Sequence, residues 1–207
     1  MTSRAATIAF QGIEAVPVDV QAQFLSGMVA FNVVGLGDKA VAESRERICC
    51  ALHASGLALP AKRVIVNLAP ADLPKDSGRF DLPIALGILA ASGQIDGAKL
   101  AGFEFAGELS LGGDLRPVRG ALAMAQAAHH EAQTVALVLP AGSAQEAALV
   151  PGSRVYCLNQ LQDLVLALAP EGPVTAAWQP LQVQTALPQT NQQTAGDLQD
   201  IKGQVGV

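Results

Sequence analysis

Hydrophobic and polar residues alternate along the first part of the chain and then follow a helical period. Between Thr7 and Phe24 apolar and polar residues alternate at a period of two, which is typical of extended chain with one buried face. A second apolar run at 28–34 ends at Gly35-Leu36-Gly37. We expect Asp38 to cap a helix that runs from Lys39 to about Ser55.

Strand-like and helix-like segments alternate through the rest of the chain. A polar loop at 69–80 separates a strand from an apolar helix that Asp81 starts. The pattern predicts strands at 63–68, 134–139 and 154–158, a hairpin formed by 103–111 and 115–118, and helices at 82–91, 119–131, 143–149 and 160–168. We therefore expect one α/β domain over residues 4–169, with helices packed on a mixed sheet.

Composition supports a folded core followed by a tail. The chain has 207 residues, of which 50% are hydrophobic and 15% charged, and this excludes a wholly disordered protein. From Pro170 onward the sequence is rich in Gln and Pro, so we expect residues 170–207 to be a flexible linker. The net charge of −5 argues against a generally basic nucleic-acid coat.

Targeting signals and metal ligands are not apparent in the sequence. There is no apolar leader and no membrane-length apolar run, so we expect a cytoplasmic protein without a membrane contact. Cys49, Cys50 and Cys157 suit free thiols better than a disulfide framework. The three histidines do not complete a zinc-ligand spacing, so no metal site is expected.

A glycine motif at residues 35–40 allows two interpretations. The sequence G-L-G-D-K-A fits the G-x-G-x-x-A pattern that brings a dinucleotide pyrophosphate to a helix N-terminus. Such a site needs an acidic residue about 20 positions later, but residues 54–61 contain none. We therefore favour a structural turn between a strand and a helix.

The polar loop allows a catalytic interpretation as well as a structural one. Ser77 could act as a nucleophile only with a base, and Lys75 is the nearby candidate. A lysine must be desolvated to lose its proton at neutral pH, and this stretch is polar. A charged loop that pairs internally or contacts a neighbouring subunit is the alternative.

Basic residues form the third candidate site. Most of the chain's basic residues fall in a few segments, and the fold could gather them into a phosphate-binding face. They are Arg45, Arg47, Lys62, Arg63, Lys75, Arg79, Arg116 and Arg119. The alternative is ordinary solvated surface, partly neutralised by nearby acidic residues.

Three segments resemble a known protein family. They are F-N-V-V-G-L-G-D-K-A-V-A-E-S-R-E-R-I (31–48), V-N-L-A-P-A-D-L-P-K-D-S-G-R-F-D-L-P-I-A-L-G-I-L-A-A-S-G (66–93) and G-E-L-S-L-G-G-D-L-R-P-V-R-G (107–120). Together they resemble the N-terminal domain of the ComM/YifB family, magnesium-chelatase-like AAA+ proteins of bacteria. The resemblance implies a fold of the ribosomal S5 domain 2-like class, similar to the Lon protease domain.

The resemblance to Lon can be followed residue by residue. Lon's P-K-D-G-P-S-A-G resembles residues 74–81, which places its nucleophilic serine at Arg79. Its L-P-I-G-G-L-K resembles residues 116–122, which places the lysine of its dyad at Leu122. The resemblance therefore implies a protease scaffold without protease chemistry.

The family resemblance also implies a function. We expect the non-catalytic N-terminal module of a ComM-like helicase or branch-migration protein, which assists ring assembly or DNA engagement. ATP and Mg would belong to an AAA+ module, because no G-x-x-x-x-G-K-[ST] loop occurs in this sequence. The expected partners are that module, neighbouring subunits of a hexamer and DNA, and the expected contacts are Arg45, Arg47, Lys75, Arg79, Arg116 and Arg119. The alternative is a residual Ser77–Lys75 hydrolase.

Overall fold

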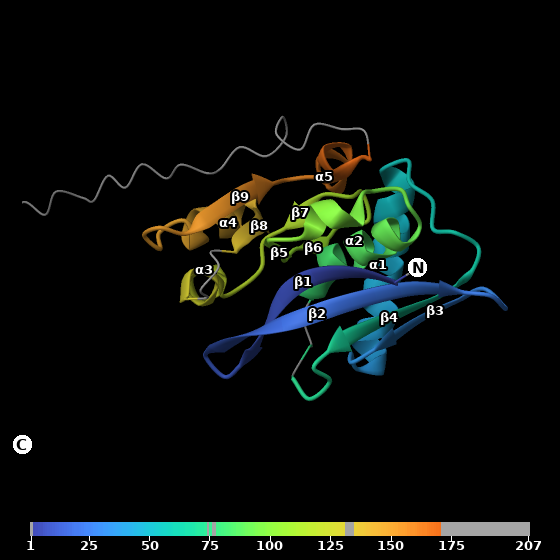
Figure 1. The fold of residues 1–207 in the computed structure, drawn as a ribbon, viewed down its shortest axis with the longest axis horizontal. Helices are drawn as coiled ribbons and strands as arrows, with labels where there is room; N and C mark the ends of the chain where they lie inside the picture. Colours follow the sequence, from blue (N-terminus) through green and yellow to red (C-terminus); the bar gives the residue numbers. More distant parts are fainter. Residues whose placement is uncertain (1, 74, 76–77, 131–134, 171–207) are drawn as a thin grey trace, which may run out of the picture.

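A seven-stranded mixed sheet with helices on both faces forms the protein in a computed structural model, which describes residues 2–73, 75, 78–130 and 135–170 (Figure 1). The strand order is β3-β4-β2-β1-β5-β8-β9. The strands are β1 (Thr2–Gln11), β2 (Glu14–Leu25), β3 (Ala30–Val34), β4 (Arg63–Ala69), β5 (Phe103–Phe105), β8 (Ala136–Pro140) and β9 (Arg154–Leu158). Antiparallel pairing joins β1 to β2 and β2 to β4, while the other neighbours run parallel. The α/β class and the mixed sheet expected from the sequence are confirmed.

The helices divide between the two faces of the sheet. They are α1 (Asp38–Ala54), α2 (Asp81–Ala91), α3 (Ala121–His130), α4 (Ala141–Ala147) and α5 (Leu161–Leu168), with short 3-10 turns η1 (Gly78–Phe80) and η2 (Gly97–Leu100). Buried side chains of α1, α2 and α5 share one hydrophobic cluster, and those of α3 and α4 share a second. Strand β1 contributes to both, because Ala5 and Ala9 face the first cluster and Ile8 faces the second.

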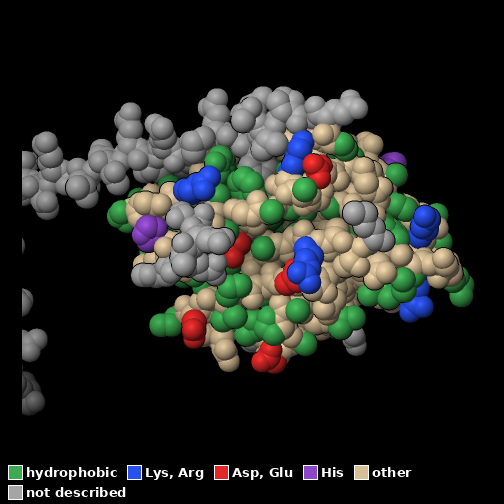
Figure 2. Space-filling view, viewed as in Figure 1, with side chains coloured by type: hydrophobic (Ala, Val, Ile, Leu, Met, Phe, Trp, Pro, Cys, Tyr) green, Lys and Arg blue, Asp and Glu red, His purple; other side chains and the backbone are tan. Residues whose placement is uncertain are grey.

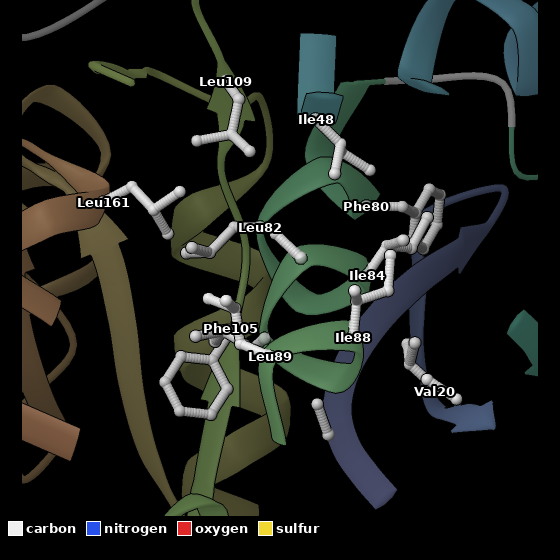
Figure 3. Close-up of a cluster of buried hydrophobic side chains, with 14 of the residues drawn as sticks. Val20, Ile48, Phe80, Leu82, Ile84, Ile88, Leu89, Phe105, Leu109 and Leu161 are labelled. Carbon is white, nitrogen blue, oxygen red and sulfur yellow. The ribbon is translucent and has the colours of Figure 1, made fainter. Parts of the chain in front are cut away.

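Helix α2 is the centre of the larger cluster. It is apolar all round, and its residues from Asp81 to Leu89 are buried, as expected for a helix enclosed by other elements. Figure 3 shows Leu82 and Leu89 on the side of α2 that faces Phe105, while Ile84 and Ile88 lie on the side that faces Val20. One helix therefore fills the space between the strands and the segment that carries β6 (Glu108–Leu109).

Most of the predicted elements are present with shifted ends, and three local predictions are wrong. The extended chain expected over 7–24 turns back at residues 12–13, so that it forms two antiparallel strands, β1 and β2. Helix α1 begins at Asp38 itself and Gly37 takes the N-cap position, so Asp38 is not the cap. The expected hairpin of 103–118 is shorter, because Phe103–Phe105 pairs within the main sheet as β5. Within that predicted hairpin, the antiparallel pair is limited to β6 and β7 (Leu115–Arg116), which form a separate two-stranded sheet. The proposed linker lies, apart from Pro170, outside the described residues.

Candidate functional site

A buried carboxylate, Asp81, joins three elements at the start of α2. Arg47 of α1 donates to it twice, from Nε to Oδ2 at 2.5 Å and from Nη2 to Oδ1 at 3.1 Å. The Ser44 hydroxyl donates to Oδ1 at 2.6 Å, and the backbone N–H of Leu109 donates to Oδ2 at 3.2 Å. Asp81 therefore ties α1 and the β6 strand to the N-terminus of α2, where the helix dipole also favours a negative charge.

Charges at this junction balance one another. Burial raises the pKa of Asp81, while the hydrogen bonds from Arg47 and Ser44 oppose that rise. The hydrogen bond to Asp81 raises the pKa of Arg47. The side chain of Arg47 is 21% exposed and also lies 3.9 Å from a Glu43 carboxylate oxygen. Arg47 therefore stabilises the interior of the fold. Its guanidinium is paired with carboxylates and is not a free cation for binding DNA.

Arg79 occupies the position that the Lon comparison gives to the nucleophile. Its guanidinium stacks over the Phe10 ring, with Cζ 4.6 Å from the ring centroid, and its Nη2 donates to the Arg119 carbonyl at 3.2 Å. Its own carbonyl accepts the N–H of Gly107 at 3.1 Å. Burial lowers the pKa of Arg79. These contacts hold η1 against the tip of the β1–β2 hairpin and against the segment that precedes α3.

The segment from Arg116 to Leu122 is fixed by helix α4. The Ser143 hydroxyl accepts the N–H of Val118 at 2.8 Å and donates to its carbonyl at 3.0 Å. Glu146 accepts the N–H of Leu122 at 3.2 Å, at the N-terminus of α3. A pocket of about 260 Å³ lies between this segment and η1, lined by Gly78, Arg79, Glu108, Pro117, Val118 and Arg119. Two segments far apart in sequence thus meet at one rigid hollow.

The structure brings some of the candidate basic residues together and separates others. Arg79, Arg116 and Arg119 lie around this hollow, with Arg116 3.6 Å from Glu108. Arg45 is exposed on α1, two positions from Arg47 and therefore on a different side of the helix. In the view of Figure 2, Lys and Arg side chains stand apart from one another rather than gathering into one patch. The basic candidates therefore reduce to a ridge formed by Arg116 and Arg119 beside the half-buried Arg79.

Lys75 is buried in its loop, contrary to the expectation of a solvated stretch. Its residue surface is 3% exposed, and its ammonium donates to the Pro70 carbonyl and, at 3.4 Å, to the Leu73 carbonyl. Burial lowers the pKa of Lys75, and the negative charge of Asp72 opposes that change. Ser77, the alternative nucleophile, lies outside the described residues. The carbonyl contacts give Lys75 a structural role within the loop.

Other candidate chemistry finds no support in the part of the chain that the structure describes. No group of three His, Cys, Asp or Glu side chains could hold a metal ion there, and no described helix is long and apolar enough to cross a membrane. The three cysteines are free thiols. A hollow of about 500 Å³ lies between the start of β1 and η2 and contains none of the candidate residues. Gly35 makes the turn between β3 and α1 at φ +96°.

The sequence pattern did not predict the hydrogen-bond network around Asp81, although it contained one indication of it. Ser44 lies four residues before the buried Ile48 on α1, so it shares the buried face of that helix. A buried hydroxyl needs a hydrogen-bond partner. That requirement, together with an aspartate directly before an apolar helix, indicates a buried polar contact near the start of α2. The sequence alone does not show which residues hydrogen-bond to each other there.

Comparison with known proteins assigns the chain to a family. A family model described as "Subunit ChlI of Mg-chelatase" matches residues 20–143. The competence protein ComM of Haemophilus influenzae is 44% identical over 157 residues, covering 76% of this chain and 30% of that protein. YifB of Salmonella typhimurium is 36% identical over 198 residues, covering 96% of this chain and 37% of that protein. The chain belongs to the ComM/YifB family.

The relatives extend well beyond the part of them that this chain matches. The YifB protein of Escherichia coli, 39% identical over 156 residues, also matches across 75% of this chain but only 30% of its own length. The chain thus spans about a third of the length of the curated relatives it matches. The region matched by the family model includes the Asp81 junction, Arg79 and the 116–122 segment.

Proposed function

We propose that this chain is a non-catalytic module of a ComM-like AAA+ protein and acts by binding rather than by chemistry. The observation that carries this proposal is the environment of Arg79. A guanidinium stacked on Phe10 and bonded to the Arg119 carbonyl stands where the Lon comparison requires a serine. An arginine held in this way offers no nucleophile, because its guanidinium stays protonated.

The second half of the Lon comparison agrees with this proposal. Leu122 stands where that comparison requires a lysine, and its side chain can neither accept nor donate a proton. The two positions still come from segments that meet at one hollow, through the Arg79–Arg119 contact. A Lon-like scaffold that has lost both reacting groups is the proposal that best accounts for this arrangement.

A residual hydrolase is the weaker alternative. It would use Lys75 as the base for Ser77, and the lowered pKa of Lys75 is favourable to that role. The ammonium nevertheless donates to two carbonyls of its own loop. A base must reach the proton that it abstracts, and these contacts direct the Lys75 amine toward its own backbone instead.

The ridge of Arg116 and Arg119 is the surface that we propose for contact with DNA phosphates or with a neighbouring subunit. Both residues are exposed, and Ser143 fixes the backbone between them through Val118. Arginines on a rigid segment lose little freedom when they bind a phosphate. The proposed whole protein would be a hexamer in which another module binds ATP and Mg.

Replacing both ridge arginines should reduce binding of forked DNA. We expect Arg116→Glu with Arg119→Glu to weaken binding at low salt by about tenfold or more. The salt dependence of binding should also flatten, because a protein that makes fewer phosphate contacts releases fewer counterions when it binds. Fluorescence anisotropy of labelled forked and single-stranded DNA, titrated with the full chain at two salt concentrations, measures both effects.

A charge-matched control separates the ridge from net charge. Lys62→Glu with Arg154→Glu makes the same change at two exposed positions away from the hollow. We expect this variant to retain most of the binding. Equal losses in both double variants would remove the ridge as a specific contact, and no binding by the unmodified chain would leave a subunit contact as its role.

A further inference from the structure

The sheet has two edge strands, and only one of them carries a charged residue. Strand β3 pairs with β4 alone, in parallel, from Ala30 opposite Arg63 to Val34 opposite Asn67. Figure 1 shows β3 next to β4 at the end of the sheet. The N–H and C=O groups along the outer side of β3 therefore have no strand partner within the described chain. Such an edge is a template for pairing with another chain.

The other edge strand, β9, carries the usual protection. It begins with the exposed Arg154, and a charge at an edge discourages further pairing. Directly after it, the Asn159 carbonyl accepts the N–H of Leu115 at 2.7 Å, and Gln160 forms a bridge with Asp114. The same chain thus pairs with the residues that directly follow β9.

The residues of β3 and its preceding turn carry no such protection. No charged residue and no proline occurs from Ser26 to Gly37. Met28, Val29 and Val34 are 86%, 65% and 52% exposed. An uncharged edge strand with exposed apolar side chains is typical of an interaction surface.

The order of side chains along β3 fits a second copy of the same strand. In an antiparallel pair centred on Asn32, Ala30 of one copy would oppose Val34 of the other, and Phe31 would oppose Val33. Phe31 and Val33 share the core side of the sheet, since they pair with Val64 and Val66.

Two Asn32 carboxamides would meet at the centre, where each can both donate and accept. No like charges oppose one another. Self-complementarity of this kind is what a two-fold interface requires.

We propose that β3 pairs antiparallel with β3 of a second copy of this chain, which joins two seven-stranded sheets across a two-fold axis at Asn32. The occupant is a second copy because the register that matches apolar to apolar and amide to amide is the self-paired one. This pairing uses none of the residues of the Arg116–Arg119 ridge, so its test does not depend on whether the ridge binds DNA.

Light scattering of the full chain after gel filtration tests the association. We expect a dimer whose fraction rises with protein concentration and which Val34→Lys converts to monomer, because the added charge lies on the shared edge. Gln23→Lys is the matched control, since it adds the same charge at an exposed position of β2, which is inside the sheet. Circular dichroism should show both variants folded. A monomer at every concentration, or a dimer that persists in Val34→Lys, would overturn the proposal.

Cysteine crosslinking tests the register. With Cys49, Cys50 and Cys157 replaced by serine, we expect oxidised Asn32→Cys to form covalent dimers. Val34→Cys alone should not do so, because the two copies of that residue would be offset by four positions, about 13 Å along the strand. A mixture of Val34→Cys and Ala30→Cys should crosslink. Crosslinking of Val34→Cys alone without crosslinking of Asn32→Cys would contradict this register.

Discussion

Arg47→Ala should lower the free energy of unfolding by about 3 kcal/mol at neutral pH, because it leaves a buried carboxylate without its counter-charge. Asp81 has essentially no exposed surface, and two of its hydrogen bonds come from Arg47. Chemical denaturation followed by circular dichroism measures the loss. Arg45→Ala on the exposed side of the same helix is the control, and we expect it to change stability by less than about 0.5 kcal/mol.

The deficit of Arg47→Ala should also depend on pH. Burial already raises the pKa of Asp81, and removing Arg47 removes a hydrogen bond that opposes the rise. A group whose pKa is higher in the folded state adds stability below its unfolded pKa and loses that stability as pH rises through its folded pKa. The loss of unfolding free energy in Arg47→Ala should therefore be largest at neutral pH. It should shrink as the pH falls toward the ordinary pKa of an aspartate.

A second change should separate charge from packing at this junction. Asp81→Asn in the Arg47→Ala background removes the uncompensated charge, so we expect it to recover part of the lost stability and to abolish the pH dependence. A deficit that is the same at acid and neutral pH would mean that Asp81 is not the group left unpaired.

Gly35→Ala should be the other strongly destabilising substitution, with an expected loss of about 3 kcal/mol. Gly35 has φ +96°, a conformation that side-chain-bearing residues rarely adopt. A Cβ at this position would also lie 2.7 Å from the Leu68 carbonyl oxygen, a backbone atom that cannot move aside. Both effects act on the turn that passes the chain from β3 to α1.

Gly37→Ala provides the matched control within the same motif. Gly37 has φ −68°, and a Cβ there would meet nothing within 4 Å. We expect a loss of under about 1 kcal/mol, set by the weaker N-cap preference of alanine. Thermal denaturation of both variants measures the difference, and equal losses would refute the structural explanation of the glycine motif.

The sequence predicted the elements of the fold better than the contacts of the site. Period-two alternation in β2 and the apolar run of α2 depend on local burial, which the order of residues records directly. The ends of elements were less accurate, as with Asp38, because the cap position depends on the geometry of the preceding turn. Phe103–Phe105 joined the main sheet instead of a hairpin because strand pairing is decided by tertiary neighbours.

The candidate basic residues show where prediction from sequence ended. Charge alone did not distinguish Arg47, which pairs with Asp81, from Arg45, which faces solvent two positions away on the same helix. Lys75 lies in a polar stretch and is nevertheless buried against carbonyls of its own loop. In each case the deciding partner is a tertiary contact, or a backbone atom whose position the sequence pattern does not specify.

The proposal that this module acts by binding rather than by chemistry is tested most directly with a serine-reactive fluorophosphonate probe. We predict no labelling of the folded full chain, with the same result for Lys75→Ala and for Ser77→Ala. Active Lon protease domain serves as the positive control for the probe. Labelling of the unmodified chain that is lost in both Lys75→Ala and Ser77→Ala would contradict the proposal and establish a serine–lysine pair.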